Sequence, residues 1–357
     1  MHRIDSIFVP WPATLLLAFL LLGALHVSAQ ATSPGSLVQP ATREVVDELG
    51  RTVRIPPSPS RIVSLAPSLT ETIYALGLQD RLVGDTDFCD YPVEAQKKPK
   101  VGGIINPNLE EIASLHPDLV LVTKSINRLD TVRALDTLGI PSYATTDPHS
   151  VAEIISSTQK LADLLGASEA GKSLAEELQS RLAALQAKLA AVPPRRVLFI
   201  VWTEPLISAG KDTFIADALR KAGGISIVQL SQDWPQISLE EVVHLQPDYL
   251  VFAASHSESA ARDFDALASR PGWRLLDAVR NRHFAVISDA VNRPAPRIVS
   301  AIEELARQLH PEVLHDSPVP EKASPQANAA PSVPPLWALA SVLPSNCSRS
   351  TESLCIH

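Results

Sequence analysis

The chain has 357 residues, of which 45% are hydrophobic and 20% are charged, and its formal net charge is −8. This length and composition are typical of a globular protein with enough apolar residues for two cores. The mild acidity and the lack of a basic run argue against nucleic-acid binding. Its three cysteines show no paired metal-ligand spacing, which argues against a zinc ribbon or an iron–sulfur cluster.

Residues 1–29 have the features of an export signal. Arg3 supplies a positive start, residues 15–25 form an apolar run, and small residues around Ala29 suit cleavage. The run is shorter than the ~20 apolar residues of a membrane-spanning helix. No cysteine lies near the cleavage site to carry a lipid, so we expect a soluble protein of the periplasm.

Residues 44–166 alternate strand and helix signals, which predicts an N-terminal α/β lobe with a largely parallel sheet. Ser68-Leu-Thr-Glu71 has the form of a capping box that opens a helix ending at Gly77. The other expected elements are a hairpin around Leu49-Gly50, strands at 61–65, 82–84 and 140–144, and a helix at 128–138.

Nearly every residue from 150 to 191 favours a helix. Ser150 and Glu153 form a capping box at its start, and Gly166 interrupts it. The second part, residues 169–191, is about 34 Å long at 1.5 Å per residue. Because it lies between two α/β regions, we expect residues 167–192 to form a rigid interlobe helix.

Residues 193–312 repeat the strand and helix alternation and predict a C-terminal α/β lobe. Its expected elements are a strand at 195–202, a helix capped by Asp212 that ends at Ala222, a strand at 283–288 and a helix at 295–309. Residues 313–357 are rich in Pro, Ser and Ala and predict a disordered tail. Cys347 and Cys355 are in this tail, and the sequence gives them no role.

An internal repeat relates the two lobes. Residues 108–122 (NLEEIASLHPDLVLV) return as residues 238–252 (SLEEVVHLQPDYLVF). In each copy Asn108 or Ser238 caps a helix, Glu111 or Glu241 can complete a capping box, and Pro-Asp precedes a buried strand. The sequence therefore predicts an α/β fold of two Rossmann-like lobes with mostly parallel sheets, joined by one long helix.

Glu110 and Glu240 are not needed for these caps. Taken alone, each is explained by its favourable interaction with the helix dipole in the first turn. The same extra carboxylate in both copies instead favours a docking surface with one contact per lobe for a basic partner.

Several motifs together resemble the cobalamin-binding and siderophore-binding proteins of ATP-binding cassette importers. The similarity extends over about residues 44–310 and includes both repeats, Arg61-Ile-Val-Ser-Leu-Ala-Pro-Ser-Leu-Thr-Glu71, Asp90-Tyr-Pro92, Val101-Gly-Gly103, Asp233-Trp-Pro-Gln236 and Pro296-Arg-Ile298. The resemblance implies an extracytoplasmic substrate-binding protein that delivers its ligand to an importer permease. It also implies that Glu110 and Glu240 dock on permease arginines. We expect the protein to act as a monomer.

The resemblance implies a ligand cleft between the lobes. The positions that match cobalamin contacts are Phe88, Trp202, Trp234, Asp289 and the nearby Arg293. Flat aromatic faces suit a macrocycle, and Asp289 can accept hydrogen bonds from peripheral amides. For each aromatic residue the alternative role is core filling or the anchoring of a loop, and the Asp-Trp-Pro setting of Trp234 is typical of a loop.

Two positions depart from the cobalamin-binding pattern. Ile104 and Thr123 stand where tryptophans are expected from the resemblance, so two stacking surfaces are missing. Cobalamin or a related corrinoid remains the first expected ligand, and haem or a ferric siderophore is the alternative.

An enzyme is the competing class of function. The sequence shows no nucleophile elbow, phosphate loop or metal signature, and the histidines have no metal-ligand spacing. We therefore expect no catalysis, no catalytic cofactor and no metal site. Cys89, beside Phe88, is expected to be a buried thiol because cysteine is usually buried.

Overall fold

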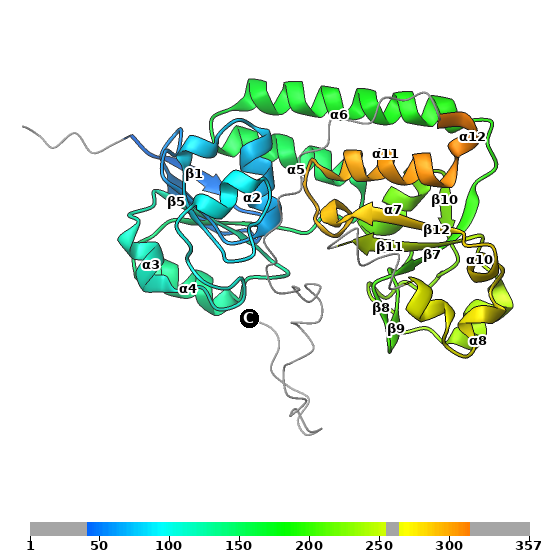
Figure 1. The fold of residues 1–357 in the computed structure, drawn as a ribbon. Coiled ribbons are helices and arrows are strands. Elements are labelled where there is room, and N and C mark those ends of the chain that lie inside the picture. The colour runs from blue at the N-terminus through cyan, green and yellow to red at the C-terminus, as the bar shows by residue number, and fades with distance from the viewer. Residues whose placement is uncertain (1–40, 255–263, 315–357) are drawn as a thin grey trace, which may run out of the picture. The chain divides into compact units, whose positions relative to one another are not determined.

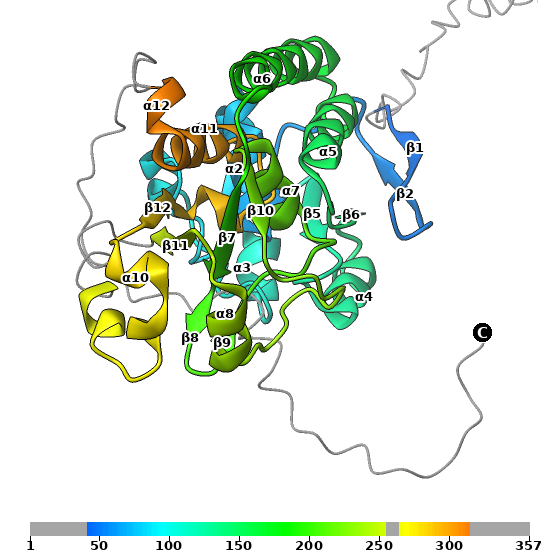
Figure 2. The same cartoon turned by 90° about the vertical axis from the view of Figure 1, so that its right-hand side faces the viewer.

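The computed structural model describes residues 41–254 and 264–314, which belong to one compact unit. Two four-stranded parallel sheets organise it (Figures 1 and 2). The first lobe holds β3 (Ile62–Ser64), β4 (Leu82–Asp85), β5 (Leu119–Thr123) and β6 (Ser142–Thr145). The second holds β7 (Arg195–Ile200), β10 (Gly224–Ser226), β11 (Tyr249–Ala254) and β12 (Phe284–Ser288). The predicted two-lobed α/β fold is confirmed.

Both sheets have the same topology. Their orders are β4-β3-β5-β6 and β10-β7-β11-β12, so in each lobe the first strand along the chain pairs with the second and the third. The sequence repeat occupies equivalent places in the two lobes, because α3 (Leu109–Ser114) precedes β5 and α8 (Leu239–Leu245) precedes β11. The repeat is therefore one helix–turn–strand unit used twice.

The strands are apolar on both faces because both faces are covered. In β7, Val197 and Phe199 join the core cluster on one face, and Leu198 and Ile200 join the cluster on the other. The covering helices are α2 (Pro67–Ala75) and α4 (Leu129–Thr137) in the first lobe, and α7 (Phe214–Lys221), α10 (Asp277–Arg280), α11 (Ile298–Leu309) and α12 (Pro311–Leu314) in the second.

Shorter elements complete the described chain. They are the hairpin β1 (Arg43–Val46) and β2 (Thr52–Ile55), the hairpin β8 (Trp202–Thr203) and β9 (Leu206–Ile207), and the single turns η1 (Gln79–Arg81), η2 (Val93–Lys97), η3 (Trp273–Leu275) and η4 (Asp289–Asn292). The expected export signal at 1–29 and all but the start of the expected tail lie outside the described residues. Among the described helices, none is long and apolar enough to cross a membrane.

Two helices connect the lobes. α5 (Val151–Leu164) places Val151, Ile154 and Ile155 in the core of the second lobe, and Leu161 and Leu164 in that of the first. α6 (Ser168–Leu189) places further residues in the core of the second lobe, and its Leu174 side chain packs against the cores of both lobes. The long helix that the sequence predicts is α6, which the break at Gly166 separates from α5 as expected. The role of α5 as a second connection was not predicted.

The helix caps agree only in part with the expected capping boxes. Ser150 Oγ accepts from Glu153 N–H at 3.2 Å, so the predicted cap by Ser150 is confirmed. Glu153 Oε2 accepts from His149 N–H at 2.8 Å and not from Ser150 N–H, so the return bond is shifted by one residue. Asn108 and Ser238 also cap their helices. The return bond from Glu111 is not formed, because Asn108 N–H donates to Val101 O instead.

Two predicted caps are wrong. The Thr213 hydroxyl, not Asp212, accepts from Ala216 N–H and caps α7. α2 begins at Pro67 without a side-chain cap, so Ser68 lies inside the helix and Glu71 is free for other contacts. A proline at the first helical position favours this start, since its fixed φ suits the helix and it lacks one of the N–H groups left unpaired at a helix start.

Candidate ligand-binding and docking sites

The expected ligand residues lie beyond the carboxyl ends of the strands. Phe88 follows β4, Trp202 follows β7, Asp289 follows β12, and Trp234 is in the connection from β10 to α8. This edge is where open parallel sheets bind ligands. Phe88 comes from the first lobe and the other residues come from the second.

Trp202 presents an exposed aromatic surface. Its side chain belongs to the β8–β9 hairpin and is 47% exposed. The indole N–H donates to the carbonyl oxygen of Glu204 at 2.8 Å, which orients the ring. The core-filling alternative for Trp202 is therefore wrong, and its ring is available for stacking.

Trp234 lies in a segment that is hydrogen-bonded to the residues that follow this hairpin. Gly210 N–H donates to Asp233 O, and Lys211 N–H donates to Leu230 O, each at 2.9 Å. A Cβ on Gly210 would lie 1.9 Å from Gln232 O, so only glycine allows this close approach. The Trp234 side chain is half-buried and packs against the core of the second lobe, so it is both anchored and partly accessible.

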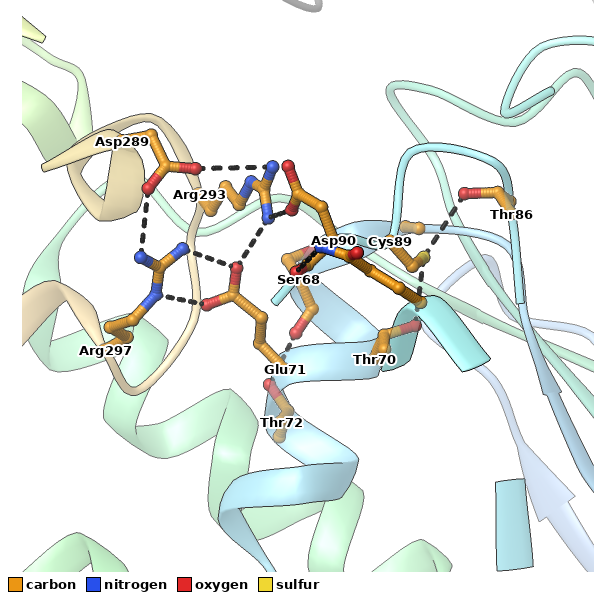
Figure 3. A network of polar contacts seen from close by, with 12 residues as sticks. Ser68, Thr70, Glu71, Thr72, Thr86, Cys89, Asp90, Asp289, Arg293 and Arg297 are labelled. Atoms are coloured by element: carbon orange, nitrogen blue, oxygen red, sulfur yellow. Dashed lines mark hydrogen bonds and ion pairs between the residues drawn. The ribbon is translucent and has the colours of Figure 1, made fainter. Parts of the chain in front are cut away.

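Cys89, next to Phe88, is a buried thiol, as predicted. Its Sγ lies 3.2 Å from Thr70 Oγ1 and 3.3 Å from Thr86 Oγ1, as Figure 3 shows. Burial raises the pKa of the Cys89 thiol above its ordinary value, so the thiol remains protonated and unreactive.

Lys100 holds the loop that carries Phe88. Its Nζ donates to Asp85 Oδ1 at 2.7 Å and to the carbonyl oxygens of Cys89 and Ala95 at 3.1 Å each. Asp85 is fully buried, and its second oxygen has no hydrogen-bond partner among the described residues. Desolvation raises the pKa of Asp85 to about 6, although the hydrogen bond and charge of Lys100 oppose the increase.

A cluster of five charged side chains joins the two lobes (Figure 3). Glu71 on α2 of the first lobe pairs with Arg293 and Arg297 of the second at 2.9 Å each. Asp289 pairs with Arg297 at 3.0 Å, and Asp90 of the first lobe pairs with Arg293 at 2.6 Å. The structure thus brings together two predicted site residues, Asp289 and Arg293, with three that the site prediction omitted.

Burial strengthens this cluster. The Glu71 side chain is 2% exposed, and that of Arg293 is 14% exposed. Burial by itself lowers the pKa of Arg293, but the hydrogen bond with Asp90 and the nearby carboxylates outweigh it, so the pKa lies above its ordinary value. Both guanidinium groups are therefore fixed cations. The motifs around Glu71 and Arg297 are present in the sequence, but Glu71 was assigned to a cap.

Ile104 and Thr123 are interior residues. Their exposed fractions are 1% and 5%, so neither offers a surface to a ligand. Asn127 holds this region together: its side-chain amide donates to Ile104 O at 2.8 Å, and its Oδ1 accepts from Thr123 N–H at 2.7 Å. Both residues are therefore part of the interior of the first lobe.

Glu110 and Glu240 occupy matching places on α3 and α8. Both follow the first residue of a capped helix, and both side chains are exposed. Neither carboxylate forms an ion pair with any described residue. Their geometry leaves them available to a basic partner, while the helix-dipole role remains compatible with it.

Two recesses on the described surface lie away from these side chains. One is lined by residues of α8 and of the connection that precedes it, and the other lies beside η1 and η2. Neither includes an expected ligand residue. Among the described residues, no three His, Cys, Asp or Glu side chains are placed to hold a metal ion.

The chain is similar in sequence and fold to known binding proteins. Residues 62–291 match the model of the periplasmic binding protein family. An uncharacterized ABC transporter substrate-binding lipoprotein of Bacillus subtilis is 32% identical over 86% of this chain and 98% of its own length. A vitamin B12-binding protein of Photorhabdus laumondii is 31% identical over 71% of this chain and 89% of its own. A periplasmic heme-binding protein from Roseiflexus superimposes with a TM-score of 0.62 at 28% identity, covering 71% of this chain and 99% of its own.

Proposed function

Because this chain belongs to the periplasmic binding protein family, we propose that it captures cobalamin or a related corrinoid between its lobes and delivers it to the permease of an ATP-binding cassette importer. The family consists of binding proteins of transporters and not of enzymes. The ligand, the contact residues and the docking contacts are the proposed part.

The placement of aromatic side chains carries the choice of ligand. Trp202 is 47% exposed at the carboxyl edge of the second sheet, and Trp234 is half-buried in a segment bonded to the same region. Phe88 follows a strand of the first lobe and is half-buried. Rings on both lobes suit the two faces of a macrocycle, and each stacked ring contributes about 1 kcal/mol beyond its buried area. The vitamin B12-binding relatives support the corrinoid class.

Haem is the second candidate, with a ferric siderophore as a further member of the same ligand class. The burial of Ile104 and Thr123 favours haem over cobalamin, because these positions cannot supply the two extra stacking rings of a cobalamin site. A heme-binding structural relative supports the same candidate.

The proposed setting is outside the cytoplasmic membrane, with the protein acting as a monomer and residues 1–29 serving for export. Glu110 and Glu240 are the proposed contacts with basic residues of the permease. Two exposed carboxylates on matching helices, one per lobe, support this assignment.

Titration with cyanocobalamin and, separately, with haemin tests the proposal. Binding of one of them at a one-to-one ratio should quench tryptophan fluorescence and release heat in a calorimeter. Trp202→Ala should weaken binding about tenfold through loss of stacking, and should leave the free energy of unfolding nearly unchanged because the side chain is exposed.

Trp273→Phe is the control for this titration. Trp273 is buried in the core of the second lobe at 4% exposure, so its replacement should not change the affinity. Failure of cyanocobalamin, haemin and ferric siderophores to bind would contradict the proposed ligand class.

A further inference from the structure

The two arginines of the charged cluster differ in how firmly they are held. Arg297 makes two bonds to one carboxylate: its Nε lies 3.0 Å from Glu71 Oε2 and its Nη2 lies 2.9 Å from Glu71 Oε1. Its Nη1 donates to Asp289 at 3.0 Å, and the ring of Tyr91 lies 3.8 Å from its Cζ. Arg297 is therefore fully engaged, since planar two-bond pairs of this kind are strong and specific.

Arg293 has a weaker partner in Asp90. Its Nη1 is shared between Glu71 Oε1 at 2.9 Å and Asp90 Oδ1 at 2.6 Å. The Asp90 side chain is 45% exposed, whereas that of Glu71 is 2% exposed. Arg293 is also the only ion-pair partner that Asp90 has among the described residues. Arg293 is largely buried and also pairs with Asp289 at 3.4 Å, so it stays in place when the half-exposed carboxylate of Asp90 turns to water. An acid from outside can then take the place of Asp90 on Arg293.

The charges of the cluster favour replacement by an acid. Two guanidinium groups face the carboxylates of Glu71, Asp289 and Asp90, so the cluster has a net charge of −1. When Asp90 turns toward water, the remaining four groups are neutral as a set, and a carboxylate from outside restores the charge that the site already holds. An amide in the same place would leave Arg293 with a weaker neutral acceptor.

The position of Asp90 links this exchange to the proposed ligand. Asp90 follows Phe88 by two residues, and Arg293 follows Asp289 by four, so one loop from each lobe carries both a proposed ligand contact and a member of the exchangeable pair. We propose that Asp90 occupies the place of an acidic group of the ligand, and that Arg293, released from Asp90, selects macrocycles with a free peripheral carboxylate over those with amides or esters only. This rests on the proposed function.

Matched ligands that differ only in the acid test this selection. Cyanocobalamin is compared with its monocarboxylic acid derivatives, and haemin with its dimethyl ester, by calorimetry on the natural protein, Asp90→Asn and Asp87→Asn. For the ring that binds, the acid form should bind more tightly. Asp90→Asn should raise the affinity for the acid form about fivefold and leave the neutral form within about twofold, because only the acid competes with Asp90.

Asp87→Asn is the matched control, since Asp87 is exposed in the same loop and its side chain has no partner among the described residues. It should change neither affinity. Equal binding of acid and neutral forms, or an Asp90→Asn variant that binds both forms less tightly, would overturn the selection while leaving macrocycle binding intact.

If neither ring binds, the proposed function fails and the exchange is tested with sodium propionate alone. The Nε–Hε NMR signal of Arg293, assigned with Arg293→Lys, should then shift at a lower propionate concentration in Asp90→Asn than in the natural protein, with sodium chloride as the ionic-strength control. The same response in both proteins would refute the role of Asp90.

Discussion

At the scale of single residues, Asp85 has an unusual environment for a carboxylate. It is fully buried, it pairs with Lys100 through one oxygen, and its other oxygen has no partner among the described residues. Desolvation raises its pKa from 3.8 to about 6. The folded protein therefore binds a proton more tightly here than the unfolded chain does, and stability contributed by this group is lost as the pH rises from about 4 through 6.

Asp85→Asn removes this titration. The free energy of unfolding of the natural protein, measured relative to Asp85→Asn, should fall by on the order of 2 kcal/mol between pH 4 and pH 7. Urea unfolding at the two pH values measures the difference. Asp80→Asn is the control for the loss of one exposed charge, and a difference that grows with pH would contradict the raised pKa.

Glu71 has the local spacing of a helix-capping residue, but its contacts are with residues distant in the chain. Ser68 and Glu71 have the spacing of a capping box, yet α2 begins at Pro67 and Glu71 contacts Arg293 and Arg297. The arginines are more than two hundred residues away in the chain, so the cap was the only partner that local spacing could offer. Their meeting depends on the placement of the second lobe.

At the scale of elements, α3 and α8 are the same device in both lobes. Each short helix begins at a side-chain cap and presents two glutamates in its first turn. Only Glu110 and Glu240 are assigned to docking, so their neighbours Glu111 and Glu241, which are also exposed, provide a matched comparison on the same helices.

Charge reversal separates the two pairs. Glu110→Lys with Glu240→Lys should abolish stimulation of the importer's ATPase in proteoliposomes, because lysines would repel a basic docking surface. Ligand affinity measured by calorimetry should stay the same. Glu111→Lys with Glu241→Lys makes the same change of net charge and should retain most of the stimulation; equal loss in both variants would argue against specific docking by Glu110 and Glu240.

At the scale of the whole molecule, the two lobes contact each other and also share helices that contribute to both cores. α5 contributes Ile155 to the core of the second lobe and Leu161 to that of the first, and α6 packs along both. The ion pairs of Glu71 with Arg293 and Arg297 are a second connection between the lobes. Glu71 is on α2, whose apolar residues belong to the core of the first lobe. Ligand binding is therefore expected to involve only small lobe movements.

Shared helices also predict cooperative unfolding. Scanning calorimetry should show one transition, because neither core is complete without α5. Ile155→Ala and Leu161→Ala, at 3% and 4% exposure, should each lower the stability of that single transition by about 2–5 kcal/mol. Two transitions, with each variant shifting only one of them, would show that the lobes unfold independently.

The sequence by itself determined the local and repeated features. Hydrophobic runs, caps and helix-ending glycines determine elements through contacts a few residues apart, so most strands, the matching helices α3 and α8 and the long helix α6 could be predicted. The short strands β9 and β10 were not predicted. The internal repeat extended this to two similar lobes. The buried Cys89 and the exposed glutamates also followed from residue type and position.

Only the tertiary structure decided how distant segments meet. The Glu71, Arg293 and Arg297 cluster, the burial of Ile104 and Thr123 around Asn127, and the sharing of α5 by both cores involve residues up to 226 positions apart. Side-chain spacing along the chain carries no information about such pairs, because their geometry is set by the packing of whole elements. For that reason the charged cluster, and with it the proposed selectivity for an acidic ligand, became visible only in three dimensions.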